Sequence, residues 1–261
     1  MDLPEIEIRA PSRGNRRLER LFSAANADGR LRAWWYMQQV NADRRDMSDH
    51  SVVHIQIVVN IALRLFRLLN RAGVEPAMVS DHGMQARDAE VVIAAACLFH
   101  DTGMSIHRTD HEQYSLFLAS DRLPLLLEGI YEEPDLTVVV SEALHAVIGH
   151  RRRGDPITIE AGIVRVADAL DMASGRSRIP FETRRPNIHS ISAAAIDTVK
   201  IEPGDERAVR IEIEMNNSSG LFQVDELLAT KLRGSGIEEH VEVLAKIDAE
   251  HEKRLVPVFR I

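Results

Sequence analysis

A long apolar segment in the first third of the chain constrains the fold most strongly. Residues 51–70 read SVVHIQIVVNIALRLFRLLN and are apolar nearly all round a helix, which is typical of a helix buried in a helical domain. The charge-free part, residues 51–63, has 13 residues and includes His54, so it is too short and too polar to span a bilayer. We therefore expect a core helix that carries a buried imidazole, and no membrane span.

Four later segments also have helical character. An Ala-rich run, which favours helix, ends at His100-Asp101, and Gly- or Pro-containing breaks separate the segments from one another. They cover residues 86–101, 107–123, 135–150 and 157–173. The sequence thus predicts a mainly α protein built on a helical bundle.

The composition changes near Pro180. Apolar and charged residues alternate on both sides of the turn-rich PGDE, a pattern typical of an antiparallel hairpin. We expect hairpin strands at residues 198–202 and 208–215, helices at 222–234 and 236–255, and a final strand at 256–261. We divide the chain into an N-terminal arm with short helices (1–47), a helical domain (48–180) and a small C-terminal α+β appendage (181–261).

Composition excludes several classes of protein. The chain has 261 residues, a net charge of −8 and a pI near 5.8, which argues against a nonspecific nucleic-acid binder. With Cys97 as its one cysteine, an internal disulfide or a thiolate metal cluster is impossible. Nitrogen and oxygen must therefore hold any metal. The N-terminus has no apolar signal segment, so we expect a cytoplasmic protein.

Three helical segments carry residues suited to one metal ion. His100 and Asp101 are adjacent at the end of a helix, His54 lies within a buried helix, and Asp168 lies within another. A buried carboxylate is costly unless it is paired or bound to metal. Imidazole and carboxylate together suit Mn, Fe, Co, Ni or Zn, and suit Mg less well.

The order of these residues resembles the H…HD…D signature of the HD-domain metal-dependent phosphohydrolase superfamily. HIQIVVNIAL, CLFHDTG and IVRVADALD are similar to its local contexts, and the resemblance covers about residues 48–180. It implies an HD-domain helical bundle in which His54, His100, Asp101 and Asp168 bind a metal. The reaction it implies is hydrolysis of a phosphate ester.

Further histidines suggest a second ion. His150 stands 18 residues before Asp168, similar to the spacing in the dinuclear branches of the superfamily, and HEQYSLFLA resembles the helix that bears their extra histidine. The resemblance therefore implies a second metal held by His111 and His150, with Asp101 bridging the two ions. We expect two divalent transition-metal ions in each chain.

Two more histidines and Asp171 have supporting roles in this hypothesis. His107 and His111 would share one face of a continuous helix, and we consider His107 a proton donor near the leaving group. His145 and His150 are five apart, so only one can face the site unless the helix bends. His145 and Asp171 are candidates to orient a ligand.

Cationic side chains could bind the substrate. Arginine matches phosphate oxygens in a bidentate way, and several arginines follow the ligand-bearing segments. Arg151, Arg176 and Arg178 are therefore catalytic candidates, in addition to Asp101 and His107. The expected substrate is a small phosphorylated molecule such as a nucleotide.

The sequence leaves other functions open. Relatives of the same superfamily use a dinuclear iron site to activate oxygen, and a nucleotide-binding regulatory module with a silent site is a further alternative. HDTGM and the lack of a GYP motif make cyclic-dinucleotide hydrolysis of the HD-GYP type doubtful. The region of Trp34 and Trp35 and the C-terminal appendage offer apolar surface for a homodimer.

Overall fold

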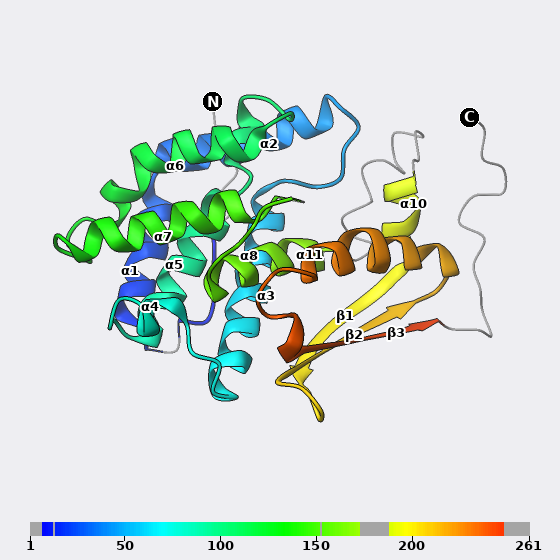
Figure 1. Ribbon diagram of the computed structural model, residues 1–261. Coiled ribbons are helices and arrows are strands. Elements are labelled where there is room, and N and C mark those ends of the chain that lie inside the picture. The colour runs from blue at the N-terminus through cyan, green and yellow to red at the C-terminus, as the bar shows by residue number, and fades with distance from the viewer. Residues whose placement is uncertain (1–6, 13, 152, 173–187, 248–261) are drawn as a thin grey trace.

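The computed structural model describes residues 7–12, 14–151, 153–172 and 188–247. Figure 1 shows a group of helices on one side and a small three-stranded sheet on the other. The expected mainly α fold with a small C-terminal α+β appendage is confirmed. Arg176, Arg178 and the expected final strand at 256–261 lie outside the described residues.

The central helix is α3 (Val52–Arg71), which is capped by the Ser51 hydroxyl. It packs against α5 (Ala86–Phe99) and α8 (Ile159–Leu170), and α6 (His111–Leu127) and α7 (Asp135–Gly149) complete the bundle (Figure 1). Within the described residues, α3 alone is long and apolar enough to cross a membrane, but 67% of its apolar window is buried inside the fold. The expected cytoplasmic location stays a prediction.

Two N-terminal helices cover the bundle. In α1 (Arg16–Ala27), Leu18 and Leu21 are fully buried. In α2 (Gly29–Asp43), Trp35 is 2% exposed and its indole N–H donates to the Leu98 carbonyl at 2.9 Å. The Trp35 ring therefore packs in the core of its own chain, and the expected homodimer stays a prediction.

Short elements connect the bundle. They are α4 (Ala77–Ser80), the 3₁₀ turn η1 (Thr102–Ser105) that follows α5, and α10 (Ile188–Ala194) before the sheet. The carboxylate of buried Glu160 accepts hydrogen bonds from the backbone N–H groups of Ala77 and Met78, at 3.1 and 3.0 Å. This contact joins α4 to α8 and satisfies two backbone donors at the start of α4.

The sheet has the strand order β1-β2-β3. Strands β1 (Ile196–Pro203) and β2 (Val209–Met215) are antiparallel, so the expected hairpin is confirmed. Strand β3 (Val241–Ile247) lies parallel to β2. Alternate residues of β2 are buried, and this apolar face packs on the core that includes α3.

The prediction of a second C-terminal helix at 236–255 is wrong for residues 236–247, the part that the structure describes. A 3₁₀ turn, η5 (Glu238–His240), leads directly into β3. The β-branched Val241 and Val243 lie two apart, a spacing that suits a strand, and they pair with Val209 and Ile211 of β2. Pairing with β2 thus decides the conformation of a segment that alone could form a helix.

Between β2 and β3 the chain is helical, as expected for residues 222–234. It forms the 3₁₀ turn η3 (Ser218–Gly220), the π-helix η4 (Gln223–Ala229) and α11 (Thr230–Leu232). Both η4 and α11 contact α8, which places them beside the helical domain (Figure 1).

Candidate metal centre

The candidate ligands lie at or beside helix ends, where side chains can converge without crossing the packed core. They are His54 in the first turn of α3, His100 and Asp101 at the end of α5, His111 at the start of α6, His150 at the end of α7, and Asp168 in the last turn of α8. Five helices therefore supply six side chains to one region.

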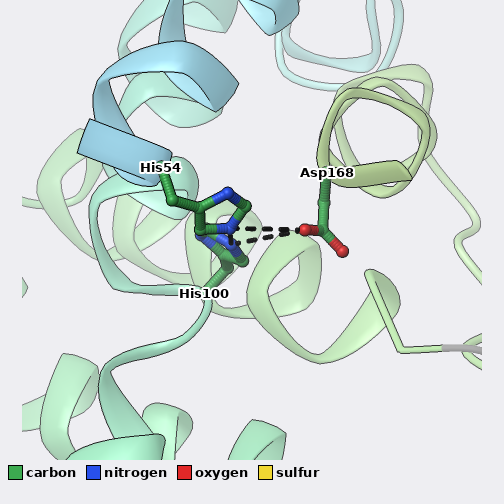
Figure 2. Close-up of side chains that lie close together, drawn as sticks. All are labelled: His54, His100 and Asp168. Atoms are coloured by element: carbon green, nitrogen blue, oxygen red, sulfur yellow. Dashed lines mark hydrogen bonds and ion pairs between the residues drawn. The ribbon is translucent and has the colours of Figure 1, made fainter. Parts of the chain in front are cut away.

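His54, His100 and Asp168 form the first ligand group (Figure 2). The two imidazole Nε2 atoms are 3.2 Å apart, and they lie 3.5 and 3.8 Å from Asp168 Oδ1. Their side chains come from three different helices and point toward one another. The arrangement presents two nitrogens and one oxygen to a common point.

Asp101, His111 and His150 form the second ligand group. Asp101 Oδ1 lies 3.0 Å from His111 Nε2 and 3.8 Å from His150 Nε2. Its other oxygen, Oδ2, lies 3.4 Å from His54 Nε2 and 3.5 Å from His100 Nε2. The Asp101 carboxylate thus faces one group with each oxygen and stands between the two.

Hydrogen bonds on the opposite ring nitrogen orient the imidazoles. His54 Nδ1 lies 2.6 Å from Asp171 Oδ2, and His100 Nδ1 lies 2.8 Å from the Cys97 carbonyl. His150 Nδ1 lies 2.5 Å from the Val147 carbonyl. Because each of these partners is an acceptor, we assign the proton to Nδ1, which leaves the Nε2 lone pair directed at the centre.

His111 has a different environment. Its Nδ1 lies 3.1 Å from the Arg108 carbonyl and 2.7 Å from the Arg108 guanidinium. Burial opposes protonation of this ring and is the largest single influence on it, but the hydrogen bond to Asp101 together with the charges of Asp101 and Glu112 outweighs burial and raises the pKa of His111. In this respect His111 differs from His100 and His150, whose pKa values are lowered.

Burial and neighbouring charges shift the pKa values of His100, His150 and Asp101. It lowers the pKa of His100, and it lowers the pKa of His150 to about 3, with a further contribution from His100. Burial would raise the pKa of Asp101, but His100, His111 and His54 together hold it well below its usual range. Neutral imidazoles beside an ionised carboxylate are the forms that bind a cation.

A tight turn fixes the position of His100 and Asp101. The Ser115 hydroxyl donates to the His100 carbonyl at 2.7 Å and accepts from the Gly103 N–H at 2.8 Å. A Cβ on Gly103 would stand 1.9 Å from the His111 carbonyl oxygen, so a larger residue would force α6 away. The glycine thereby lets His111 approach Asp101.

Other expected site residues do not join these groups. Helix α6 begins at His111, so His107 does not share its helical face; His107 is exposed, and its Nδ1 accepts from the Thr109 N–H at 3.1 Å. His145 Nε2 accepts from the Ile157 N–H at 3.1 Å. In the described part of the chain, Arg151 makes no ion pair with the ligand carboxylates.

One functional candidate was missed by the sequence reasoning. Lys231, on α11 in the C-terminal region, forms an ion pair with Asp168 Oδ2. Its local sequence, TKLRG, resembles an ordinary exposed helix end, and no spacing relates it to the histidines. Only the docking of α11 on α8 reveals the contact.

Comparison with known proteins identifies the family. The HD domain profile matches residues 48–173, which include both ligand groups. The chain belongs to the HD domain family. It is also 38% identical over 207 residues to the uncharacterized protein MJ1020 of Methanocaldococcus jannaschii, an alignment that covers 79% of this chain and 80% of the relative.

The HD domain places the chain in a superfamily of metal-dependent phosphohydrolases. The matched residues end at 173, whereas the alignment with the archaeal relative spans 207 residues and so extends beyond the HD domain. The expected membership of the HD-domain superfamily is confirmed.

Proposed function

We propose that this protein is a metal-dependent phosphohydrolase that acts in the cytoplasm and cleaves a phosphate ester, either of a nucleotide or of a small phosphodiester. The observation that carries the proposal is the position of Asp101, whose two oxygens face two separate groups of buried imidazoles. A single metal ion would use only one of these groups. Two groups with a shared carboxylate favour a pair of ions.

The donor set fits divalent transition metals. All donor atoms in each group lie within 4.8 Å of one another, and they combine imidazole nitrogen with carboxylate oxygen, which suits Mn, Fe, Co, Ni or Zn better than Mg. His54, His100 and Asp168 would hold one ion, and His111 and His150 the other, with Asp101 shared. Such ions supply a water of lowered pKa and neutralise phosphoryl oxygens.

The chain's own residues would prepare this chemistry. Asp171 holds the His54 ring by its Nδ1 atom, and backbone carbonyls hold His100 and His150 in the same way. Because all three rings are buried, bulk water does not compete for their Nε2 atoms. The site is thus preorganised, which lowers the cost of assembling ligands around a cation.

Residues outside the two groups remain candidates for substrate contacts. His107, exposed four positions before His111, is our candidate for the proton donor to the leaving group. Arg151, at the end of α7, and Arg176 and Arg178, beyond α8 in sequence, are candidates for phosphate binding.

A phosphatase assay with metal analysis tests the proposal. We expect protein purified without chelating resin to contain two transition-metal ions per chain by mass spectrometry, and to release p-nitrophenol from bis-p-nitrophenyl phosphate. Asp101→Asn should lose both properties, whereas Asp121→Asn, at an exposed residue of α6, should keep them. Metal-loaded protein that hydrolyses no phosphate ester, but consumes oxygen with iron bound, would overturn the proposal.

A further inference from the structure

The C-terminal region reaches the candidate metal centre through one lysine. The ammonium group of Lys231 pairs with Asp168 Oδ2, and the two side chains are only 15% and 13% exposed. Asp168 Oδ1 faces His54 and His100 instead. The Asp168 carboxylate therefore has the first ligand group on one side and a cationic side chain on the other.

The ligand that Lys231 contacts adjoins the second ligand group. His54 Nε2 lies 3.5 Å from Asp168 Oδ1 and 3.4 Å from Asp101 Oδ2, and Asp101 belongs to the second group. The ammonium group is thus held at the edge of the first group, whose ligands meet those of the second at Asp101.

The backbone around Lys231 is fixed against α8. The Arg165 guanidinium donates to the carbonyl of Thr230, the residue before Lys231, at 3.3 Å. A Cβ on Gly162 would stand 1.8 Å from the Ser235 carbonyl oxygen, so the two backbones touch at this glycine. Leu228, one turn before Lys231, is 1% exposed. Residues before and after Lys231 in the sequence are thus held by tertiary contacts, and these contacts fix its position.

A mostly buried ammonium group needs anionic or polar partners. It offers three N–H donors, and the described ion pair with Asp168 accounts for one of them. Lysine commonly binds phosphate as a compact point charge. A metal ion bound to Asp168 would neutralise part of its charge, so Lys231 would interact less strongly with that carboxylate. A phosphate anion would then be the better partner for the remaining N–H donors of Lys231.

We infer that Lys231 is a substrate-binding residue, whose ammonium group donates to a phosphoryl oxygen of the ester held at the two ligand groups. The C-terminal region is therefore part of the active site and not a separate module. This inference rests on the proposed function for the nature of the substrate. The anion-binding role of Lys231 can be measured without turnover.

The test compares Lys231→Met with Lys231→Arg in the full-length, Mn²⁺-loaded protein. Methionine keeps the length of the side chain and removes its charge. Isothermal titration with inorganic phosphate should show binding weakened about 10- to 100-fold in Lys231→Met, because a hydrogen bond to a charged group is lost. Lys231→Arg should retain part of the affinity. Lys246→Met, at an exposed lysine of β3, is the matched control and should bind phosphate like the wild type.

Metal content and circular dichroism separate the possible outcomes. We expect Lys231→Met to keep its metal and its helical signal, with a raised KM in any ester assay. Unchanged phosphate affinity would overturn the inference, and so would loss of metal, since Lys231 would then only position Asp168. If Lys231→Met does not fold, the same comparison is made with Lys231→Gln.

Failure of the proposed function gives a different result. If the wild-type protein hydrolyses no phosphate ester but binds phosphate in a Lys231-dependent way, the phosphohydrolase proposal fails and the anion-binding role stands. If the metal-loaded wild type binds no phosphate, the inference about Lys231 is wrong regardless of the reaction.

Discussion

The helical domain and the C-terminal region contribute to the candidate centre in opposite ways. The helical domain supplies all six candidate ligands, each at a helix end and each beside a recognisable sequence stretch. The C-terminal region supplies one side chain, Lys231, from a segment whose sequence carries no such motif. Metal binding is thus encoded locally, whereas the contact from the C-terminal region depends on how the two parts pack.

The largest expected effect is loss of metal when a ligand supplied by the helical domain is removed. Asp168→Asn and His100→Ala should each lose the ion of the first group, so that bound metal falls from two ions per chain to at most one, because each removes a donor from that group. Helical content, followed by circular dichroism, should stay nearly intact. Two ions per chain in either purified variant, measured by mass spectrometry, would contradict the ligand assignment.

A smaller effect is expected from Asp171→Asn, which leaves every candidate ligand in place. The amide cannot replace the charged partner of His54 Nδ1, 2.6 Å away, so metal affinity should fall about 10- to 100-fold. Titration against a chromophoric chelator measures the change. Asp205→Asn, at an 80% exposed side chain before β2, is the control, and equal affinities for the two variants would exclude an orienting role for Asp171.

The interface between the regions can be tested at one glycine. Gly162→Ala should destabilise the protein by about 1–3 kcal/mol, because the added methyl group would overlap the Ser235 carbonyl. Metal content should be retained while phosphate binding weakens, since Lys231 is displaced. Gly29→Ala, where a Cβ meets nothing within 4 Å, is the matched control in urea unfolding. Identical stability of both variants would mean that the contact between α8 and the Ser235 loop is not tight.

The smallest effect is expected on the exposed side of the sheet. A hydrogen bond from Lys200, at 2.7 Å, lowers the pKa of Glu214. A carboxyl with a lowered pKa in the folded state stabilises the protein above its unfolded pKa, and this contribution is lost as the pH falls through the folded pKa. Because the pair is solvent-exposed, Glu214→Gln should shift the melting temperature by less than about 2 °C at pH 7. A larger shift, or one that grows in acid, would show that this surface matters to stability.

The two regions also differ in how far the sequence predicted them. Apolar periodicity located α3, α5, α7 and α8, and the HD motif gave residues that do converge in space. The prediction that His107 and His111 share one helical face was wrong. Asp110, which precedes the first residue of α6, has a φ of 58°, so the helix does not continue back to His107. A turn of this kind has no signal in helical periodicity.

In the C-terminal region, local pattern was insufficient. The segment that forms β3 has charged residues that also suit an amphipathic helix, and its pairing with β2 decides the outcome. Lys231 could not be predicted, because its contact with Asp168 joins residues 63 positions apart through the packing of α11 on α8. Tertiary contacts between short elements leave no spacing in the sequence to read.

The position of His100 and His150 as the C-caps of α5 and α7 has an electrostatic consequence. The peptide dipoles of a helix place a partial negative charge at its C-terminal end, and the effect is strongest within the last turn. Two helices therefore direct this end of their dipoles at the same small volume. These C-terminal ends offset the partial positive charge of the two helix N-termini that also meet there, those of α3 at His54 and of α6 at His111.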